Sequence, residues 1–405
     1  MAKSKPDSSS PEKAHPEATV AAMLGRVRVV GTEPLRWQAA FGRVLTEPVR
    51  ADRPSPAADV SAMDGYALRL ADLTAKELAV AGEVAAGSPA GTLPVGAAIR
   101  VFTGAVVPEG TEMVIPREEL DESPGVIRFR GKVNPMRGRC IRRCAENIAE
   151  GGEVVPAGTP MNTAVLGAIA AFGRSQLSVR KSVRVSIVTT GDELLTLDAA
   201  PKTWQIRDSN GPALLMLLSG LAWVEVVALK RIADRLGDLS ATVKELLGQS
   251  DAVVITGGVS LGDRDHVPAA IREAGAEIVF HKLPIKPGSP MLGATGPKGQ
   301  AILALPGNPV SAMVTMRRFG ITVLRQMAGF VAPAEKRAVV EVSGALPHPS
   351  LWTYPLVTIS SHGSATAVGG KGSGDVVSAA RADGFVEVPP GAKATDRFPF
   401  WPWRV

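Results

Sequence analysis

Two stretches of the same design constrain the fold of this chain most strongly. Val183 to Thr190 is an apolar, β-branched run that ends in Gly191-Asp-Glu, and Asp251 to Thr256 is a second apolar run that ends in Gly257-Gly258. Each is typical of a buried parallel strand whose carboxyl end opens onto a glycine loop. Ligands bind at this edge of α/β sheets, because glycine allows close approach and loop N–H groups bind anions. One such loop is an ordinary turn, but two at matching strand ends favour an anion-binding site.

The stretch after residue 183 alternates between strand and helix patterns. Strands are predicted at 184–189, 223–229, 251–256, 277–281 and 301–305, and helices at Gly211–Leu221, Arg235–Leu247, His266–Ala274 and Pro309–Met327. This alternation predicts an α/β domain with a doubly wound parallel sheet.

The flanking segments are rich in short strands. Helices are predicted at Glu17–Met23, Pro34–Leu45 and Asn162–Phe172, short strands from Tyr66 to about residue 133, and further short strands from Arg337 to Val405, with one helical stretch around Val376–Ala382. The expected divisions are a disordered tail at 1–16, a linker or dimerisation domain at 17–50 plus 147–182, a small β domain at 51–146, the α/β domain at 183–330 and a C-terminal β domain at 331–405.

Composition narrows the class of partner. The net charge is +6, but lysine and arginine are scattered and are not interleaved with aromatic residues. A polyanionic small molecule therefore explains the charge as well as nucleic acid would, and we expect no nucleic-acid partner. No apolar run approaches the roughly 18 residues of a membrane span, and no signal peptide is recognisable, so we expect a cytoplasmic protein without membrane contact. Cys140 and Cys144 have a spacing found in some metal sites, but no second pair lies nearby, which favours reduced thiols.

A series of short motifs resembles one known family. In chain order they are Ser61-Ala-Met-Asp-Gly-Tyr-Ala67, Phe102-Thr-Gly-Ala105, Thr190-Gly-Asp-Glu-Leu194, Asp208-Ser-Asn210, Thr256-Gly-Gly-Val-Ser260 with Gly262-Asp-Arg-Asp265, Lys286-Pro-Gly288, Leu305-Pro-Gly-Asn-Pro-Val-Ser311 and Gly372-Ser-Gly-Asp375. The chain resembles the molybdopterin molybdenumtransferase family, to which the E domain of gephyrin also belongs. Each motif is weak alone, but their common order from about Glu17 to the C-terminus is specific.

The resemblance implies a function and an assembly. In such a family, molybdate replaces the adenylate of adenylylated molybdopterin with release of AMP, and a Mg²⁺-dependent hydrolysis drives the insertion. The resemblance also implies a homodimer, in which Asp64 of one subunit acts at the α/β domain of the other. Transient contacts with other cofactor-biosynthesis proteins or with molybdoenzymes are a further expectation.

The motif residues receive roles from this chemistry. Mg²⁺ prefers oxygen ligands and keeps several waters, so the candidates for catalysis and metal binding are Asp64, Glu193 and Asp265, with Asp192 and Asp263 as second choices. The alternative is that these are solvated turn acids. The predicted contacts with phosphate and pterin are Thr103, Gly191, Asp192, Ser209, Gly257, Gly258, Ser260 and Ser373.

A second group of residues is predicted to bind an oxyanion. Lys282 and Lys286 are four residues apart and would face one anion, unless they are ordinary surface lysines. Pro306, Gly307 and Asn308 precede a long helix, whose free N–H groups suit molybdate, and Ser311 adds a hydroxyl donor. His266 is expected to cap or pack rather than to bind a ligand.

The chain departs from the family pattern at four positions. Val60 stands in place of asparagine, Asn147 in place of an acid and Ser289 in place of a lysine, and Leu351 stands where an arginine is expected. Each lost charged contact would cost about 1.5–3 kcal/mol. Two hypotheses follow: a working insertase, or a paralogue that binds molybdopterin without inserting metal and serves as a carrier, chaperone or regulator.

Overall fold

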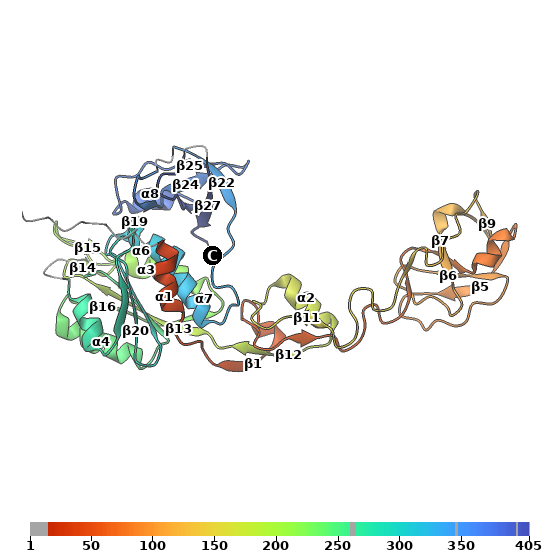
Figure 1. Cartoon of the computed structure of the whole chain (residues 1–405), viewed down its shortest axis with the longest axis horizontal. Coiled ribbons are helices and arrows are strands. Elements are labelled where there is room, and N and C mark those ends of the chain that lie inside the picture. Colours follow the sequence, from red (N-terminus) through yellow and green to blue (C-terminus); the bar gives the residue numbers. More distant parts are fainter. Residues whose placement is uncertain (1–14, 260–264, 345–346, 394–395, 405) are drawn as a thin grey trace, which may run out of the picture. The chain divides into compact units, whose positions relative to one another are not determined.

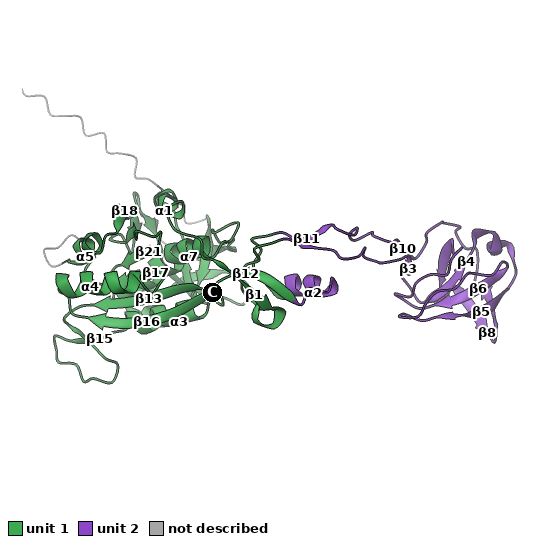
Figure 2. Ribbon diagram, turned by 90° about the horizontal axis from the view of Figure 1, so that it is seen from below, with its two compact units in different colours: residues 1–47, 157–163, 176–405 green, residues 48–156, 164–175 purple. Residues whose placement is uncertain are grey.

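The computed structural model describes residues 15–259, 265–344, 347–393 and 396–404. The chain forms two compact units, shown in Figure 2: unit 1 comprises 1–47, 157–163 and 176–405, and unit 2 comprises 48–156 and 164–175. Nearly all of the predicted tail at 1–16 lies outside the described residues. Among the described helices, none has the length and apolar character needed to cross a bilayer.

A six-stranded sheet organises unit 1. Its order is β16 (Val224–Ile232), β13 (Val183–Thr190), β17 (Ala252–Thr256), β21 (Ala301–Leu305), β20 (Leu292–Thr295) and β18 (Glu277–His281). The first four strands are parallel, as predicted. The strand at 292–295 was not predicted, and it pairs antiparallel with both of its neighbours. The sheet is therefore mixed, with a parallel core.

Helices cover both faces of this sheet (Figure 1). On one side α1 (Pro16–Leu24), α3 (Asn210–Ser219) and α7 (Ile321–Met327) share a core with Val185 and Ile187 of β13. On the other side α4 (Leu236–Leu247) and α5 (Val267–Glu273) pack against the alternate strand residues Val253 and Ile255. Alternate side chains of a strand point to opposite faces, so these long apolar runs are buried on both faces. The predicted doubly wound architecture is confirmed.

The predicted helix at 309–327 is a single helical run with a local change of geometry. It consists of α6 (Pro309–Thr315), a π-helical turn (Met316–Gly320) and α7. A π turn adds a residue to the helix and often marks a functional region. In this chain it carries two consecutive buried arginines, Arg317 and Arg318, toward the C-terminal domain.

The C-terminal part of unit 1 is a closed barrel. Its strand order is β22 (Val339–Ser343), β25 (Ala365–Ala367), β24 (Leu356–Ile359), β26 (Gly384–Val386) and β27 (Arg397–Pro402). The short helix α8 (Val376–Arg381) lies in the helical stretch predicted there. The predicted C-terminal β-rich unit is therefore present as a barrel.

Unit 2 contains a second six-stranded sheet. Its order is β7 (Met113–Pro116), β4 (Gly65–Leu68), β6 (Ala97–Val101), β5 (Leu78–Val84), β9 (Val126–Phe129) and β8 (Leu120–Ser123). Unit 2 also contains two separate two-stranded sheets: β3 (Val60–Ser61) with β10 (Ile141–Arg142), and β2 (Val49–Arg50) with β11 (Glu153–Val155). The helix α2 (Thr163–Ala171) agrees with the prediction for 162–172.

The predicted helix at Pro34–Leu45 is wrong. Residues Thr32–Arg36 form strand β1, which pairs antiparallel with β12 (Gln176–Arg180), and only a short 3-10 turn follows at Trp37–Ala39. Trp37 and Phe41 are exposed, whereas Ala40, Val44 and Leu45 are buried, so the apolar residues at helix-like spacing are not buried together on one face. Pairing with a distant strand outweighs local propensity here.

Candidate functional site

A polar cavity of about 760 Å³ lies at the carboxyl ends of the parallel strands of unit 1. The loops that follow β13, β17 and β21 supply most of its wall, as the α/β rule for ligand sites requires. Its lining includes nine of the predicted site residues: Gly191, Glu193, Ser209, Gly257, Gly258, Asp265, Pro306, Gly307 and Asn308.

Two side chains of the Asp208-Ser-Asn motif hold these loops together. Asp208 accepts hydrogen bonds from Thr189 Oγ1 at 2.7 Å and from the Gly211 N–H at 3.0 Å, which ties the end of β13 to the start of α3. Asn210 Nδ2 donates to Thr256 Oγ1 at 2.9 Å and to the Gly307 carbonyl at 2.8 Å. The cavity wall is therefore held in one arrangement by its own hydrogen bonds.

Three buried oxygen atoms in this cavity have no hydrogen-bond partner within the described part of the chain. They are Thr190 Oγ1, Asn210 Oδ1 and Asp234 Oδ1, and they make up three of the eight such side-chain atoms among the described residues. A buried polar atom without a partner costs about 1–3 kcal/mol, so such atoms are rare unless a ligand satisfies them. Their concentration in one cavity marks it as a ligand-binding site.

Asp234 is a site residue that the sequence analysis missed. It follows β16, another parallel strand, and lines the cavity with Glu193 and Asp265. Burial raises the pKa of Asp234, and the negative charges of Asp192, Asp265 and Glu193 raise it further, whereas His266 lowers it. The position at the end of a parallel strand is the signal that would have found it.

Gly257 shows why glycine is needed in the cavity wall. It has φ +100°, and a Cβ atom built there would lie 2.2 Å from the Thr190 carbonyl oxygen of the neighbouring strand. Any other residue would push the loop away from β13, because a Cβ atom is attached directly to the main chain of the loop and the oxygen that it meets belongs to the main chain of the strand.

We expect Gly257→Ala to destabilise the protein by about 2–3 kcal/mol, from positive φ and overpacking together. Gly307→Ala is a matched control in the same cavity, because its Cβ would meet only Gly257 Cα at an ordinary 3.6 Å. Urea unfolding of both variants measures the difference, and equal costs would contradict this account.

The remaining predicted residues of unit 1 do not line the cavity. Lys282 and Lys286 are exposed, and Ser311 is buried. The Ser373 hydroxyl accepts a 3.0 Å hydrogen bond from Asn308 Nδ2. Asp192 Oδ1 accepts from the Asp234 N–H at 3.3 Å. Ser260 and Asp263 lie outside the described residues.

In unit 2, the predicted site residues Asp64 and Thr103 contact each other. Asp64 Oδ1 accepts hydrogen bonds from the backbone N–H and from the hydroxyl of Thr103, both at 2.8 Å. These bonds, supported by Arg117 and Arg100, lower the pKa of Asp64. The lowered pKa favours the charged form of this exposed carboxylate.

Two of the departures from the family pattern have clear structural consequences. The Ser289 hydroxyl donates to the Leu283 carbonyl at 2.9 Å, so it braces its own loop and places no charge there. Asn147 bridges two neighbours, since Oδ1 accepts from Arg142 at 2.9 Å and Nδ2 donates to Ser55 at 3.2 Å. Both positions are neutral and serve local structure.

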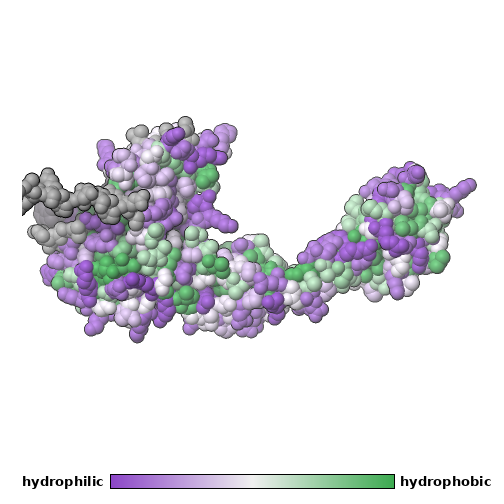
Figure 3. Space-filling view, viewed as in Figure 1, coloured by the Kyte–Doolittle hydropathy of each residue, from purple (hydrophilic) through white to green (hydrophobic). Residues whose placement is uncertain are grey.

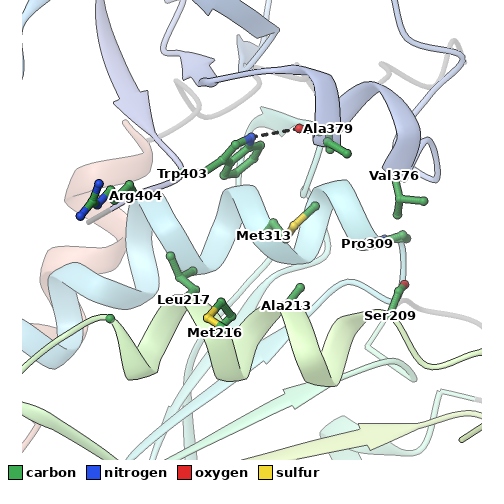
Figure 4. A pocket seen from close by; sticks show the side chains of 12 residues that line it. Ser209, Ala213, Met216, Leu217, Pro309, Met313, Val376, Ala379, Trp403 and Arg404 are labelled. Carbon is green, nitrogen blue, oxygen red and sulfur yellow. Dashed lines mark hydrogen bonds between the residues drawn. The ribbon is translucent and has the colours of Figure 1, made fainter. Parts of the chain in front are cut away.

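An apolar cavity of about 750 Å³ adjoins the polar one and shares Ser209, Pro309 and Val376 with it. Figure 4 shows Ala213, Met216 and Leu217 on α3 facing Met313 of α6 and the Trp403 ring, which donates to the Ala379 carbonyl at 3.2 Å. On the face of unit 1 shown in Figure 3, hydrophobic residues form separate patches among hydrophilic ones. Met216 stands out because it is 75% exposed on a helix that is otherwise packed.

The doubly wound sheet, the glycine loops at its strand ends and the polar cavity between them define an α/β protein with a site for a polar small molecule. Three family models match the chain: MoeA N-terminal region (domain I and II) at 14–173, probable molybdopterin binding domain at 186–326 and MoeA C-terminal region (domain IV) at 353–397.

Proteins named molybdopterin molybdenumtransferase are similar to this chain. One from Nostoc is 36% identical over 74% of this chain and 70% of its own length, and one from Haemophilus influenzae is 34% identical over 74% and 73%. A solved structure of a molybdopterin biosynthesis moeA protein from Pyrococcus horikoshii shares the fold, with a TM-score of 0.79 and 24% identity over 96% of this chain and all of that one. The chain belongs to the molybdopterin molybdenumtransferase family.

Proposed function

We propose that this protein inserts molybdate into adenylylated molybdopterin and releases AMP, in a Mg²⁺-dependent reaction of molybdenum-cofactor biosynthesis. The observation that carries the proposal is the group of three unpartnered oxygens, on Thr190, Asn210 and Asp234, in the cavity at the strand ends. Acceptor oxygens of this kind suit a divalent cation and the N–H groups of a pterin. Membership of the family supplies the reaction class.

The residues of the cavity fit a Mg²⁺ ion that binds together with substrate. Among the described residues, no three His, Cys, Asp or Glu side chains converge as a preformed metal site. Mg²⁺ bound with nucleotide phosphates needs only one or two carboxylates and keeps several waters. Glu193, Asp234 and Asp265 are the candidate carboxylates of the cavity, and one or two of them would hold the ion together with the substrate phosphates and Asp64 of a second subunit. When bound, the ion would neutralise charge on the phosphoanhydride and polarise it toward water.

The chain's own groups would position the two substrates. The backbone at Gly191, Gly257 and Gly258 allows the phosphates to approach the strand ends closely. Asn308 lies at the start of a helical run from Pro309 to Met327, where N–H groups without helical partners favour an oxyanion such as molybdate. Lys286 is exposed on the neighbouring loop and would add a positive charge.

Release of AMP from adenylylated molybdopterin by the purified protein tests this proposal. It should require both molybdate and Mg²⁺. Asp64→Asn keeps an oxygen for Thr103 but loses the charge, so we expect it to slow release about tenfold, the effect of one lost charged contact. Thr103→Ser keeps both hydrogen bonds to Asp64 and is the control. Tight binding of the substrate without AMP release would support the non-catalytic paralogue instead, and no binding would overturn both.

We further propose that the protein is a homodimer in which the apolar face of α3 is covered by the second subunit. Met216, Val376 and Val377 are 75%, 40% and 56% exposed around the apolar cavity. Exposed apolar surface of this kind is typical of a protein interface. Met216→Glu would place a charge there, and we expect light scattering to show a monomer. The control, Leu229→Glu, changes an exposed apolar residue of β16 outside this cavity and should leave the mass unchanged.

A further inference from the structure

Thr315 connects two elements that each carry predicted oxyanion-binding residues. It is fully buried at the end of α6, directly before the π turn. Its hydroxyl donates to the Ser311 carbonyl at 2.7 Å and lies 3.2 Å from the Ala312 carbonyl. Its methyl group faces Gly288, where a Cβ atom would lie only 2.4 Å from Thr315 Cγ2. The two branches of one side chain therefore contact two separate segments.

The first of these segments is the loop that carries Lys286. Its shape is fixed by its own hydrogen bonds, from the Leu283 N–H to the Ser289 carbonyl at 2.8 Å and from the Met291 N–H to the Gly288 carbonyl at 3.1 Å. Gly288 has φ +106°, a conformation that favours glycine, and its main chain lies against the Thr315 methyl. These bonds hold the main chain of the loop in one shape, so the contact between Gly288 and Thr315 sets how closely the loop can approach the helix.

The second segment is the first turn of α6, which carries Asn308 and Ser311. The Ala312 N–H donates to the Asn308 carbonyl at 3.0 Å, and the Thr315 hydroxyl donates to the Ser311 carbonyl, three residues farther along the chain. A threonine hydroxyl bound to the carbonyl four residues earlier slightly bends a helix. The π turn that follows changes the helix geometry again. Thr315 therefore influences the direction of the N–H groups at the helix start.

We propose that Thr315 is a positioning residue that fixes the Lys286 loop and the first turn of α6 at the separation needed to bind one oxyanion together. This inference rests on the proposed function, because the oxyanion is molybdate. Thr315 does not touch the anion. Its methyl group acts through Gly288 on the position of Lys286, and its hydroxyl acts through Ser311 on the helix start.

Two substitutions separate these contacts. Gly288→Ala creates the clash with the Thr315 methyl, and Thr315→Ser removes that methyl but keeps the hydroxyl. The double variant moves a methyl group from one side of the contact to the other. Gly275→Ala is the control for backbone strain alone, because Gly275 has φ +83° and nothing within 4 Å of its Cβ position.

We expect Gly288→Ala to raise the KM for molybdate in AMP release about tenfold, because residues in direct contact couple by about this amount. The change in kcat should be smaller. Adding Thr315→Ser should return the KM to within about threefold of the parent, the remainder being backbone strain. Gly275→Ala should leave the KM unchanged. A double variant no better than Gly288→Ala would overturn the proposal.

Amide hydrogen exchange provides a readout that does not depend on activity. Gly288→Ala should speed exchange at residues 312–316, and Thr315→Ser should reverse the effect. Unchanged exchange in α6 would overturn the proposal even in an active enzyme. If Gly288→Ala speeds exchange and Thr315→Ser reverses it (coupled exchange) while the KM stays the same, then Thr315 serves stability only, and the proposal is also overturned. An inactive parent protein with coupled exchange would instead overturn the proposed function, and with it the role of Thr315 in binding molybdate.

Discussion

Asp234→Asn is expected to make the protein more stable but less active. We expect AMP release to slow about a hundredfold, because the loss of a residue that supports a metal site costs about 10–100-fold in activity. Asp234 has a buried carboxylate oxygen without a partner, among the negative charges of Asp192, Glu193 and Asp265. Removing its charge relieves this repulsion and the cost of burying the charge, so the variant should unfold at a higher temperature. The same change would remove a proposed ligand of the cation on which the proposed reaction depends.

Scanning calorimetry and AMP-release kinetics on the same samples measure the two effects. Asp238→Asn is the control, since Asp238 is an exposed acid in the first turn of α4, four residues farther along the chain. That variant should lose a little stability and no activity, because an acid at a helix start is mildly stabilising. A less stable Asp234→Asn would show that the carboxylate has a favourable partner in the free protein.

The stability gain should depend on pH in a defined direction. Burial raises the pKa of Asp234 above its ordinary value of 3.8. Below pH 3.8 this carboxyl is protonated in both the folded and the unfolded chain, so parent and variant should then be equally stable. As the pH rises through the folded-state pKa, the parent loses stability and the variant does not. The difference in free energy of unfolding between variant and parent should therefore grow from pH 3.8 to the folded-state pKa of Asp234 and stay constant at higher pH.

The sequence predicts the sheet core and the glycine loops well, because their signals are local. Val183–Thr190 and Ala252–Thr256 are long apolar runs that only a strand buried on both faces accommodates. The glycines that follow them line one cavity, as expected from the carboxyl-end rule. The parallel core and the position of the cavity therefore follow from sequence alone.

The sequence does not predict features that depend on distant partners. Leu292–Thr295 is short and contains Gly293, and it becomes a strand because β18 and β21 pair with it on both sides. Asn210 carries no sign of its hydrogen bonds to Thr256 and Gly307, which lie 46 and 97 residues away. Asp234 has no adjacent glycine. For Asp234 the only signal in the sequence is its place after a predicted parallel strand, and the contacts of Asn210 become visible only when the strand ends are brought together.

A buried ion pair between Arg318 and Glu387 joins the C-terminal barrel to the α/β domain of unit 1. Arg318 donates to Glu387 through Nε at 2.7 Å and Nη2 at 2.9 Å, and both side chains are 6% exposed. Trp401 Nε1 donates to the same carboxylate at 3.2 Å. Burial disfavours the charge on Arg318, but Glu387, together with Tyr354 and Glu17, raises the pKa of Arg318 overall. The carboxylate therefore compensates a cation that water does not reach.

Glu387→Gln is expected to destabilise the protein by about 3–5 kcal/mol, because it leaves a buried guanidinium without its main counter-charge. Among the residues that the structure describes, Glu17, half-exposed on α1, would then be the remaining anionic partner of Arg318. The control is Glu277→Gln, which removes an ion pair with Arg26 whose side chains are 47% and 73% exposed, a kind worth about 0–1 kcal/mol. Urea unfolding of both variants measures the contrast.

The double variant Arg318→Met/Glu387→Leu separates the cost of an unpaired charge from the value of the pair itself. Replacing both charges with apolar groups of similar size removes the desolvation penalty together with the attraction. The double variant should therefore recover most of the stability lost in Glu387→Gln. Arg318 also lies over the Trp401 ring, at 4.5 Å from its centroid. If the double variant is as unstable as Glu387→Gln, then this packing, and not charge compensation, holds the barrel in place.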